Sequence, residues 1–158
     1  MDFTTSMDEI VRKRTMGVAL LFFSMPFYFL AFGMNKVFVI SFFVVFMAIL
    51  LFTYLKKTVK YSIDKNSILI CRRIGNVEIN IKDIGRVDKI HHDLIKKETK
   101  GGAFGYVGQF DTEIGRTHWF TTRRDQLVLL TKKDGTKIML SPDMPDEFIK
   151  QVDEMISC

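Results

Sequence analysis

The chain has 158 residues, a formal net charge of +5 and a hydrophobic fraction of 47%, which suits one domain with an appendage. Its two cysteines, Cys71 and Cys158, provide no disulfide framework, and neither has a nearby partner at a metal-ligand spacing. The composition therefore argues against a disulfide-stapled secreted fold and favours a reducing compartment.

Apolar residues concentrate in residues 15–55, where ten of the fifteen phenylalanines lie and Lys36 is the only charged residue. Two transmembrane helices are expected, residues 15–34 and residues 37–55, each covering roughly 30 Å. Residues 35–36 would form a tight external turn, and Pro26 would kink the first helix. The alternative is a cleaved signal peptide with "VRKR" before it and "AFG" as the cleavage site, although this apolar stretch exceeds the usual length.

The charges that flank the two spans predict their orientation. Three basic residues precede the first span, and Lys56, Lys57 and Lys60 follow the second. Under the positive-inside rule, residues 1–14 form a cytoplasmic N-terminal segment and residues 56–158 form a cytoplasmic domain.

From residue 56 onward, the sequence shows the alternating pattern of β-strands. The expected strands are "TVKYSI", "SILICRR", "VEINI", "GRVDKIHH", "RTHWFTT", "DQLVLLT" and "KIMLS". The segment "PDEFIKQVDEMIS" then has an apolar stripe at helical spacing, with Asp143 expected as the N-cap and Pro145 in the first turn. The predicted fold class is a membrane α-helical hairpin followed by an α+β domain, whose antiparallel sheet is covered by the terminal helix.

The stretch "KGGAFGYVGQF", residues 100–110, is rich in glycine and raises the question of a phosphate-binding loop. Such a loop ends in Gly-Lys-Ser/Thr and opens a helix, whereas "QFDTEIGR" follows here without any helical pattern. Bulky residues alternate with small ones along the stretch, which predicts an extended segment. Gly105 and Gly108 are therefore interpreted as structural glycines that bend a strand or allow close approach.

Three segments, "EINIKDIGRVDKI", "GGAFGYVGQF" and "TKIMLSPDMPDEFIKQV", give the region from Lys56 to Ile156 a family likeness. It resembles the bacterial pleckstrin-homology-like (PH-like) domains, and more narrowly the short bacterial membrane proteins that carry one after two transmembrane helices. The resemblance implies about seven antiparallel strands in a bent sheet or split barrel closed by a C-terminal helix. It further implies a non-enzymatic platform for lipids, peptides or protein surfaces in the bacterial inner (cytoplasmic) membrane, and it supplies no ligand residues and no cofactor.

The basic residues of the domain are the candidate contacts for anionic lipid or for a partner. They are Lys56, Lys57, Lys60, Lys96, Lys97, Lys100, Arg123 and Arg124. Each basic residue close to an anionic bilayer adds about 1 kcal/mol of attraction. For the clusters beyond residue 60, solvated strand ends and turns are the favoured interpretation, and contact with lipid headgroups is the alternative.

Other classes of site find little support in the sequence. Adjacent histidines in a strand point to opposite faces, so His91 and His92 predict no metal site. No nucleophile elbow and no distinctive pair of carboxylates is present, so no catalytic residue is predicted. The basic pI of about 9.2 is partly explained by membrane topology, and Trp119 is expected in the core, so nucleic-acid binding is not predicted.

The leading hypothesis is a membrane-anchored, non-enzymatic binding or scaffold module whose partners are membrane lipids and a protein, with a homo-oligomer as a further possibility. One alternative is an accessory subunit that joins a larger membrane complex through its Phe-rich hairpin. A weaker alternative is a nucleotide-binding regulator that uses the glycine segment.

Overall fold

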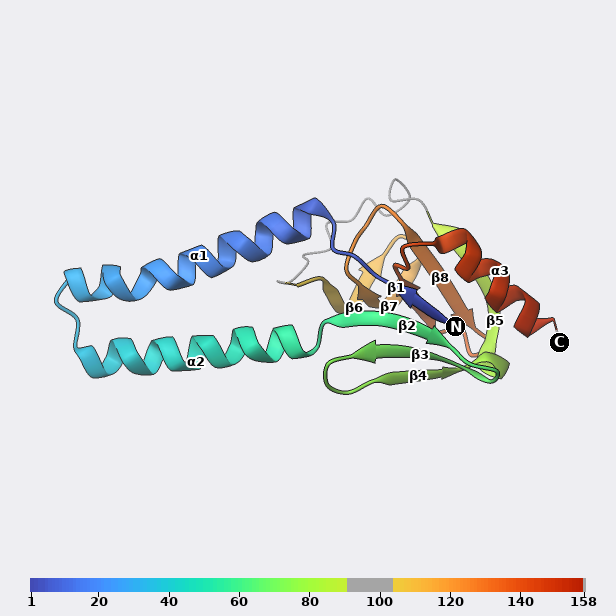
Figure 1. Cartoon of the computed structure of the whole chain (residues 1–158), viewed down its shortest axis with the longest axis horizontal. Coiled ribbons are helices and arrows are strands. Elements are labelled where there is room, and N and C mark those ends of the chain that lie inside the picture. Colours follow the sequence, from blue (N-terminus) through green and yellow to red (C-terminus); the bar gives the residue numbers. More distant parts are fainter. Residues whose placement is uncertain (91–103, 158) are drawn as a thin grey trace.

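The computed structural model describes residues 1–90 and 104–157 of the chain. A hairpin of two long helices extends from one end of a β-rich domain, and the C-terminal helix lies at the other end (Figure 1). The predicted order of apolar helices, strands and a final helix is confirmed.

The hairpin consists of α1 (Glu9–Ala31) and α2 (Lys36–Leu55), and both helices are long and apolar enough to cross a membrane. The carboxylate of Asp8 accepts a hydrogen bond of 2.7 Å from the Val11 amide and so caps α1. Asn35 caps α2 in the same way, through the Val37 amide at 2.9 Å. Because of the Asp8 cap, α1 begins well before the apolar span expected from residue 15.

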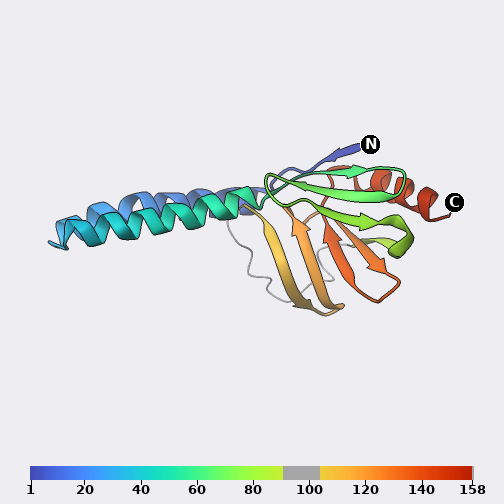
Figure 2. The ribbon, with the colours of Figure 1, turned by 90° about the horizontal axis from the view of Figure 1, so that it is seen from below.

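Within the described residues, nine strands form two sheets. The first sheet has the order β1 (Asp2–Thr4), β2 (Thr58–Ile63), β3 (Ser67–Arg72) and β4 (Val77–Asn80). The second has the order β5 (Ile84–Ile90), β8 (Leu127–Lys132), β9 (Lys137–Leu140), β7 (Gly115–Thr121) and β6 (Tyr106–Thr112). In Figure 2, the strands β6 to β9 run across the strands of the first sheet.

The sheets differ from the seven antiparallel strands expected. β7 and β9 pair in parallel, with Trp119 opposite Met139, and the glycine stretch contributes the additional strand β6. A single turn of 3-10 helix, η1 (Ile81–Asp83), connects β4 to β5. The seven strand segments named from the alternating pattern are confirmed within the described residues; His91 and His92, the last two residues of "GRVDKIHH", lie outside them.

The strand β1 was not anticipated, because it precedes the hairpin in sequence yet belongs to the domain. Residues 1–8, here called the N-terminal strap, run along the domain before α1 begins. β1 pairs with β2, and the Phe3 ring is 1% exposed with its edge against Phe148, 5.2 Å between ring centroids. The Thr5 hydroxyl donates to the Ser141 carbonyl at 2.7 Å. The domain therefore includes residues on both sides of the hairpin.

The main core lies between the two sheets and α3 (Pro145–Ile156), which buries Phe148 and Val152 completely. The buried Tyr61 hydroxyl joins the sheets, since it donates to the Phe120 carbonyl at 2.6 Å and accepts from the Ser141 amide at 3.0 Å. Burial raises the pKa of Tyr61, so this hydroxyl stays protonated and keeps its donor role at neutral pH.

Trp119 belongs to a second apolar cluster, on the opposite face of the five-stranded sheet, together with Val11 of α1. The Trp119 side chain is 1% exposed, and its indole N–H donates to the Thr117 hydroxyl at 2.6 Å. The expectation that Trp119 is a core residue is confirmed.

The prediction that Asp143 caps the C-terminal helix is wrong. Met144 occupies the N-cap position of α3 without any side-chain hydrogen bond, and Pro145 begins the helix as expected. Asp143 instead accepts hydrogen bonds from the N-terminal strap, at 2.9 Å from the Thr4 hydroxyl and 2.6 Å from the Ser6 hydroxyl. These long-range donors compete successfully with the local capping role.

Candidate functional site

The candidate site is the end of the domain where the hairpin joins it. α2 passes into β2 through two residues, and the turn between β3 and β4 folds back beside the end of α2 (Figure 1). The Ile74 amide donates to the Leu55 carbonyl at 3.1 Å, and the Arg73 guanidinium lies 4.6 Å from the centre of the Tyr54 ring. These contacts place the turn next to the last turn of α2.

Positive charge accumulates at this end. Lys56, Lys57, Arg73 and Ile74 are here called the junction face. Burial, and secondly the charge of Arg73, lower the pKa of Lys57, so the two cations lie close enough to repel each other. The Lys56 ammonium lies 4.4 Å from the centre of the Phe52 ring. Among the described residues, no carboxylate forms an ion pair with any of these three cations.

Apolar surface accompanies these charges. Ile74 is 60% exposed in the turn between β3 and β4. A cavity of about 160 Å³ lies at the same end of the domain, lined by Phe52, Lys56, Lys57 and Val107 among others. Apolar side chains mixed with cations suit the boundary between lipid headgroups and acyl chains.

Phe104 connects both helices of the hairpin to the domain. Its amide donates to the Thr15 hydroxyl of α1 at 3.1 Å, and its ring meets the Tyr54 ring of α2 edge-on, 5.4 Å between centroids. Its φ of 69° is positive, which is rare for a bulky residue and costs of order 1–3 kcal/mol. The contacts with two helices hold this strained backbone in place.

The glycine stretch has a backbone role at the same end. A Cβ atom on Gly105 would lie 2.7 Å from the Thr121 carbonyl oxygen, and its φ of +140° is disfavoured for other residues. Gly108, with a φ of +139°, lies within β6. A strand, not a helix, follows Gly105, so the stretch lacks the helix N-terminus on which a phosphate-binding loop depends.

Arg123 holds the N-terminal strap to the domain. Its guanidinium pairs with Asp125 at 2.5 Å and with Asp143 at 3.0 Å, and the side chain is only 18% exposed. Its Nη1 also donates to the Ser6 hydroxyl at 3.1 Å. The hydrogen bonds that it donates to Asp125 raise the pKa of Arg123 further and outweigh the opposing effect of burial.

The remaining candidate cations differ in their surroundings. The Arg124 guanidinium lies 4.4 Å from the centre of the buried Tyr106 ring, and Lys60 pairs with Asp2 of β1 at 2.5 Å. Lys96, Lys97 and Lys100 lie outside the described residues, as do His91 and His92. The structure thus groups Lys56 and Lys57 at the junction face, whereas Arg123 and Lys60 pair with carboxylates.

Sequence reasoning missed Arg73 and Ile74. The doublet Arg72–Arg73 before an apolar residue at a predicted turn was a usable signal, since such a turn places its side chains in solvent. Its position beside α2 depends on how β3 and β4 fold back and is not visible in the local pattern. Among the described residues, no group of three or more His, Cys, Asp or Glu side chains could hold a metal ion.

Residues 59–156 match the family model described as bacterial PH domain, which covers well over half of the chain. No curated protein and no solved structure matches the chain. The matched region begins in β2 and ends with α3, so it leaves out the hairpin and the N-terminal strap.

Proposed function

We propose that this chain, which belongs to the bacterial PH domain family, is a non-enzymatic binding module that its hairpin anchors in the bacterial inner membrane. PH domains are typically binding or scaffold modules without catalytic activity. In this proposal both helices cross the membrane, residues 35–36 face outward, and the domain with both chain ends lies in the cytoplasm. The junction face then rests on the lipid headgroups, while the rest of the domain is available to a protein partner.

The observation that carries this proposal is the positive charge of the junction face at the end of two apolar helices. Among the described residues, Lys56, Lys57 and Arg73 form no ion pair with a carboxylate, so an anionic surface would meet three cations that lack a carboxylate partner. Anionic lipids of the cytoplasmic leaflet provide such a surface, worth about 1 kcal/mol for each cation close to it. Ile74 can enter the interfacial region at the same depth.

Cysteine labelling in intact cells tests the topology. In a chain that carries Cys71→Ser and Cys158→Ser, we introduce Asn35→Cys in the hairpin turn or Lys65→Cys in the β2–β3 turn. A membrane-impermeant maleimide applied to spheroplasts should label position 35 at once and position 65 only after lysis. Labelling of position 65 in intact spheroplasts would overturn the cytoplasmic placement, and release of the chain by alkaline carbonate would overturn the anchor.

A second candidate function is supported by the hairpin itself. An apolar groove of about 440 Å³ lies between α1 and α2 beside Pro26, lined by Phe23, Phe27 and Phe43 with neighbouring aliphatic residues. Phe27 is 74% exposed there, and close packing is what drives helices together within a bilayer. The groove would fit a helix of a larger membrane complex. Replacing both helices with an unrelated hairpin abolishes partner capture if this function holds and preserves it if the domain binds the partner.

A further inference from the structure

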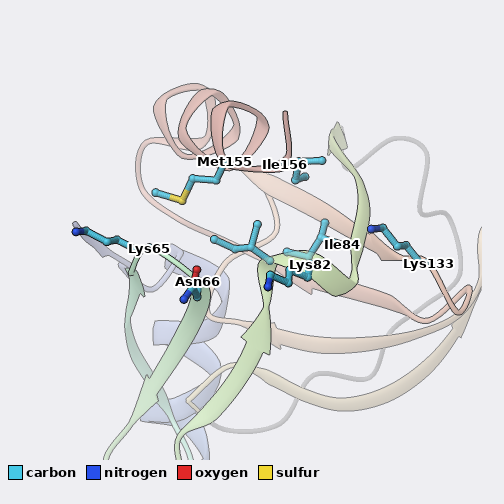
Figure 3. Close-up of a pocket in the computed structure, with 8 residues that line it drawn as sticks. Lys65, Asn66, Lys82, Ile84, Lys133, Met155 and Ile156 are labelled. Carbon is cyan, nitrogen blue, oxygen red and sulfur yellow. The ribbon is translucent and has the colours of Figure 1, made fainter. Parts of the chain in front are cut away.

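The end of the domain farthest from the hairpin carries a second basic site. A cavity of about 450 Å³ lies between the end of α3, the η1 turn and the turns that follow β2 and β8 (Figure 3). It is here called the distal pocket. Its lining residues are Lys65, Asn66, Ile81, Lys82, Ile84, Lys133, Met155 and Ile156.

Three lysines from three separate turns surround this cavity, and all three are exposed. In the part of the chain that the structure describes, none of their ammonium groups forms an ion pair. Lys89 differs from them, since it pairs with Asp146 of α3 at 2.7 Å. The three cations of the distal pocket are thus available to an external anion.

The floor between the lysines is apolar. Ile81 and Ile84 are 5% and 0% exposed, and Met155 and Ile156 extend over the cavity from the last turn of α3 (Figure 3). An occupant therefore needs both an apolar group for the floor and negative charges for the rim. Methionine adapts its shape to different apolar partners, which suits a docking surface.

We infer that the distal pocket binds an acidic segment of a partner protein that inserts one or two apolar side chains between its own carboxylates. The β2–β3 turn lies at the opposite end of β2 from α2, so the bilayer that holds the hairpin does not reach the pocket (Figure 1). Sites for small molecules fix their ligand by a few precisely placed polar groups, whereas this rim offers ammonium groups on long, flexible side chains. Charge complementarity of this kind steers and selects a protein segment.

This inference rests on the proposed function as a binding module and names the chemistry of the partner. The test uses full-length protein in nanodiscs of neutral phosphatidylcholine. The probe is a fluorescein-labelled hexapeptide with two leucines between four glutamates, and glutamines replace the glutamates in a control peptide. Fluorescence anisotropy should show saturable binding of the acidic peptide alone.

Two matched sets of substitutions locate the binding. The variant Lys65→Gln, Lys82→Gln, Lys133→Gln should weaken peptide binding by about tenfold or more. A control with Arg116→Gln, Lys89→Gln and Lys150→Gln removes the same charge at residues that do not line the pocket and should retain binding within about twofold. Met155→Trp fills the apolar floor without changing charge and should also abolish binding. Circular dichroism checks that each variant is folded.

Several outcomes would overturn the inference. One is an absence of peptide binding at about 1 mM peptide. Another is an equal loss of peptide binding in the pocket variant and the control variant, which would mean that the peptide responds only to general charge attraction. Loss of self-association in the pocket variant would assign the pocket to a second copy, whose α3 exposes Glu147, Asp153 and Glu154. Loss of binding to vesicles of phosphatidylglycerol would assign it to another bilayer. If the peptide does not bind but cysteine labelling gives the expected topology, the inference about the pocket is wrong and the membrane-anchored module still holds. If the peptide binds but position 65 is labelled in intact spheroplasts, only the placement of the anchor is contradicted.

Discussion

The two ends of the domain are both basic, but they hold their cations differently. At the junction face, Lys56 and Arg73 lie over aromatic rings of α2, and Phe104 contacts both helices of the hairpin. At the distal pocket, three lysines extend from turns over an apolar floor, and none of them forms an ion pair with another described residue. In the two proposals, positive charge beside the apolar hairpin meets lipid headgroups, whereas positive charge around an open cavity meets an acidic protein segment.

The largest effect is expected from loosening the N-terminal strap, which packs into the domain although the hairpin separates the two in sequence. Phe3→Ala removes a ring that is 1% exposed and should reduce the free energy of unfolding by about 3–5 kcal/mol. Urea titration in micelles measures it through the fluorescence of Trp119, the only tryptophan. The control Phe27→Ala, at an exposed position of the hairpin, should leave domain unfolding unchanged. Similar small losses in both variants would show that the strap does not belong to the domain core.

A second change strains the junction end and leaves the distal end intact. Gly105→Ala places a Cβ atom against the Thr121 carbonyl in a backbone region that favours glycine, so stability should fall by roughly 1–3 kcal/mol or more. Gly75 also has a positive φ, of +74°, but a Cβ atom at that position would meet no other atom within 4 Å. Gly75→Ala should therefore cost only about 1–2 kcal/mol. An equal loss of stability in both, measured by urea titration, would refute the steric role of Gly105.

Acid should weaken the attachment of the strap. Burial alone would raise the pKa of Asp143, but hydrogen bonds from Ser6, Thr4 and Arg123 outweigh it and hold that pKa below its usual value. A lowered folded pKa means that the contribution of Asp143 to stability is complete above the unfolded pKa of about 3.9 and is lost as the pH falls through the folded value. Asp143→Asn should cost about 1–3 kcal/mol at neutral pH.

The same variant separates Asp143 from the other carboxylates. Part of the fall in stability below about pH 4 should disappear in Asp143→Asn, because its amide does not titrate. Unfolding curves measured across this pH range decide the matter. An unchanged acid transition would mean that Asp143 contributes nothing to it.

The smallest expected effect concerns the junction face itself. Arg73→Gln removes one cation near the proposed headgroup layer and should weaken its attraction to anionic lipid by about 1 kcal/mol. An environment-sensitive fluorophore on Ile74→Cys reports the contact, since adding phosphatidylglycerol to neutral nanodiscs should shift its emission to the blue. Arg73→Gln should reduce that shift, and Arg116→Gln, at a surface away from the hairpin, should not. If the emission shift is equal in the labelled protein, in its Arg73→Gln variant and in its Arg116→Gln variant, then Arg73 does not contribute to the contact with lipid.

Local patterns explain which parts of the fold the sequence could predict. The alternation in "TVKYSI" and the apolar stripe of Phe148 and Val152 depend on neighbours a few residues away, and both elements formed as expected. β1 could not be predicted because three residues carry too little pattern and pair with β2 across the whole hairpin. Asp143 has a local capping signal, but donors far away in sequence occupy its carboxylate.

The candidate site was less predictable for the same reason. Lys56 and Lys57 could be placed from their position after the second apolar span, because the chain itself holds them there. Arg123 looked equivalent in the sequence, yet Asp125 and Asp143 pair with it in the fold. The cations of the distal pocket come from three turns that only the tertiary structure brings together.

The most direct test of the central claim measures the depth of both ends of the domain in one membrane. In the chain with Cys71→Ser and Cys158→Ser, a nitroxide is attached to Ile74→Cys or to Lys65→Cys, and the protein is reconstituted in anionic liposomes. Power-saturation EPR should show position 74 accessible to oxygen and shielded from a water-soluble nickel complex, with the opposite result at position 65. Equal access of the nickel complex to both positions would contradict an anchored domain with its junction face on the membrane.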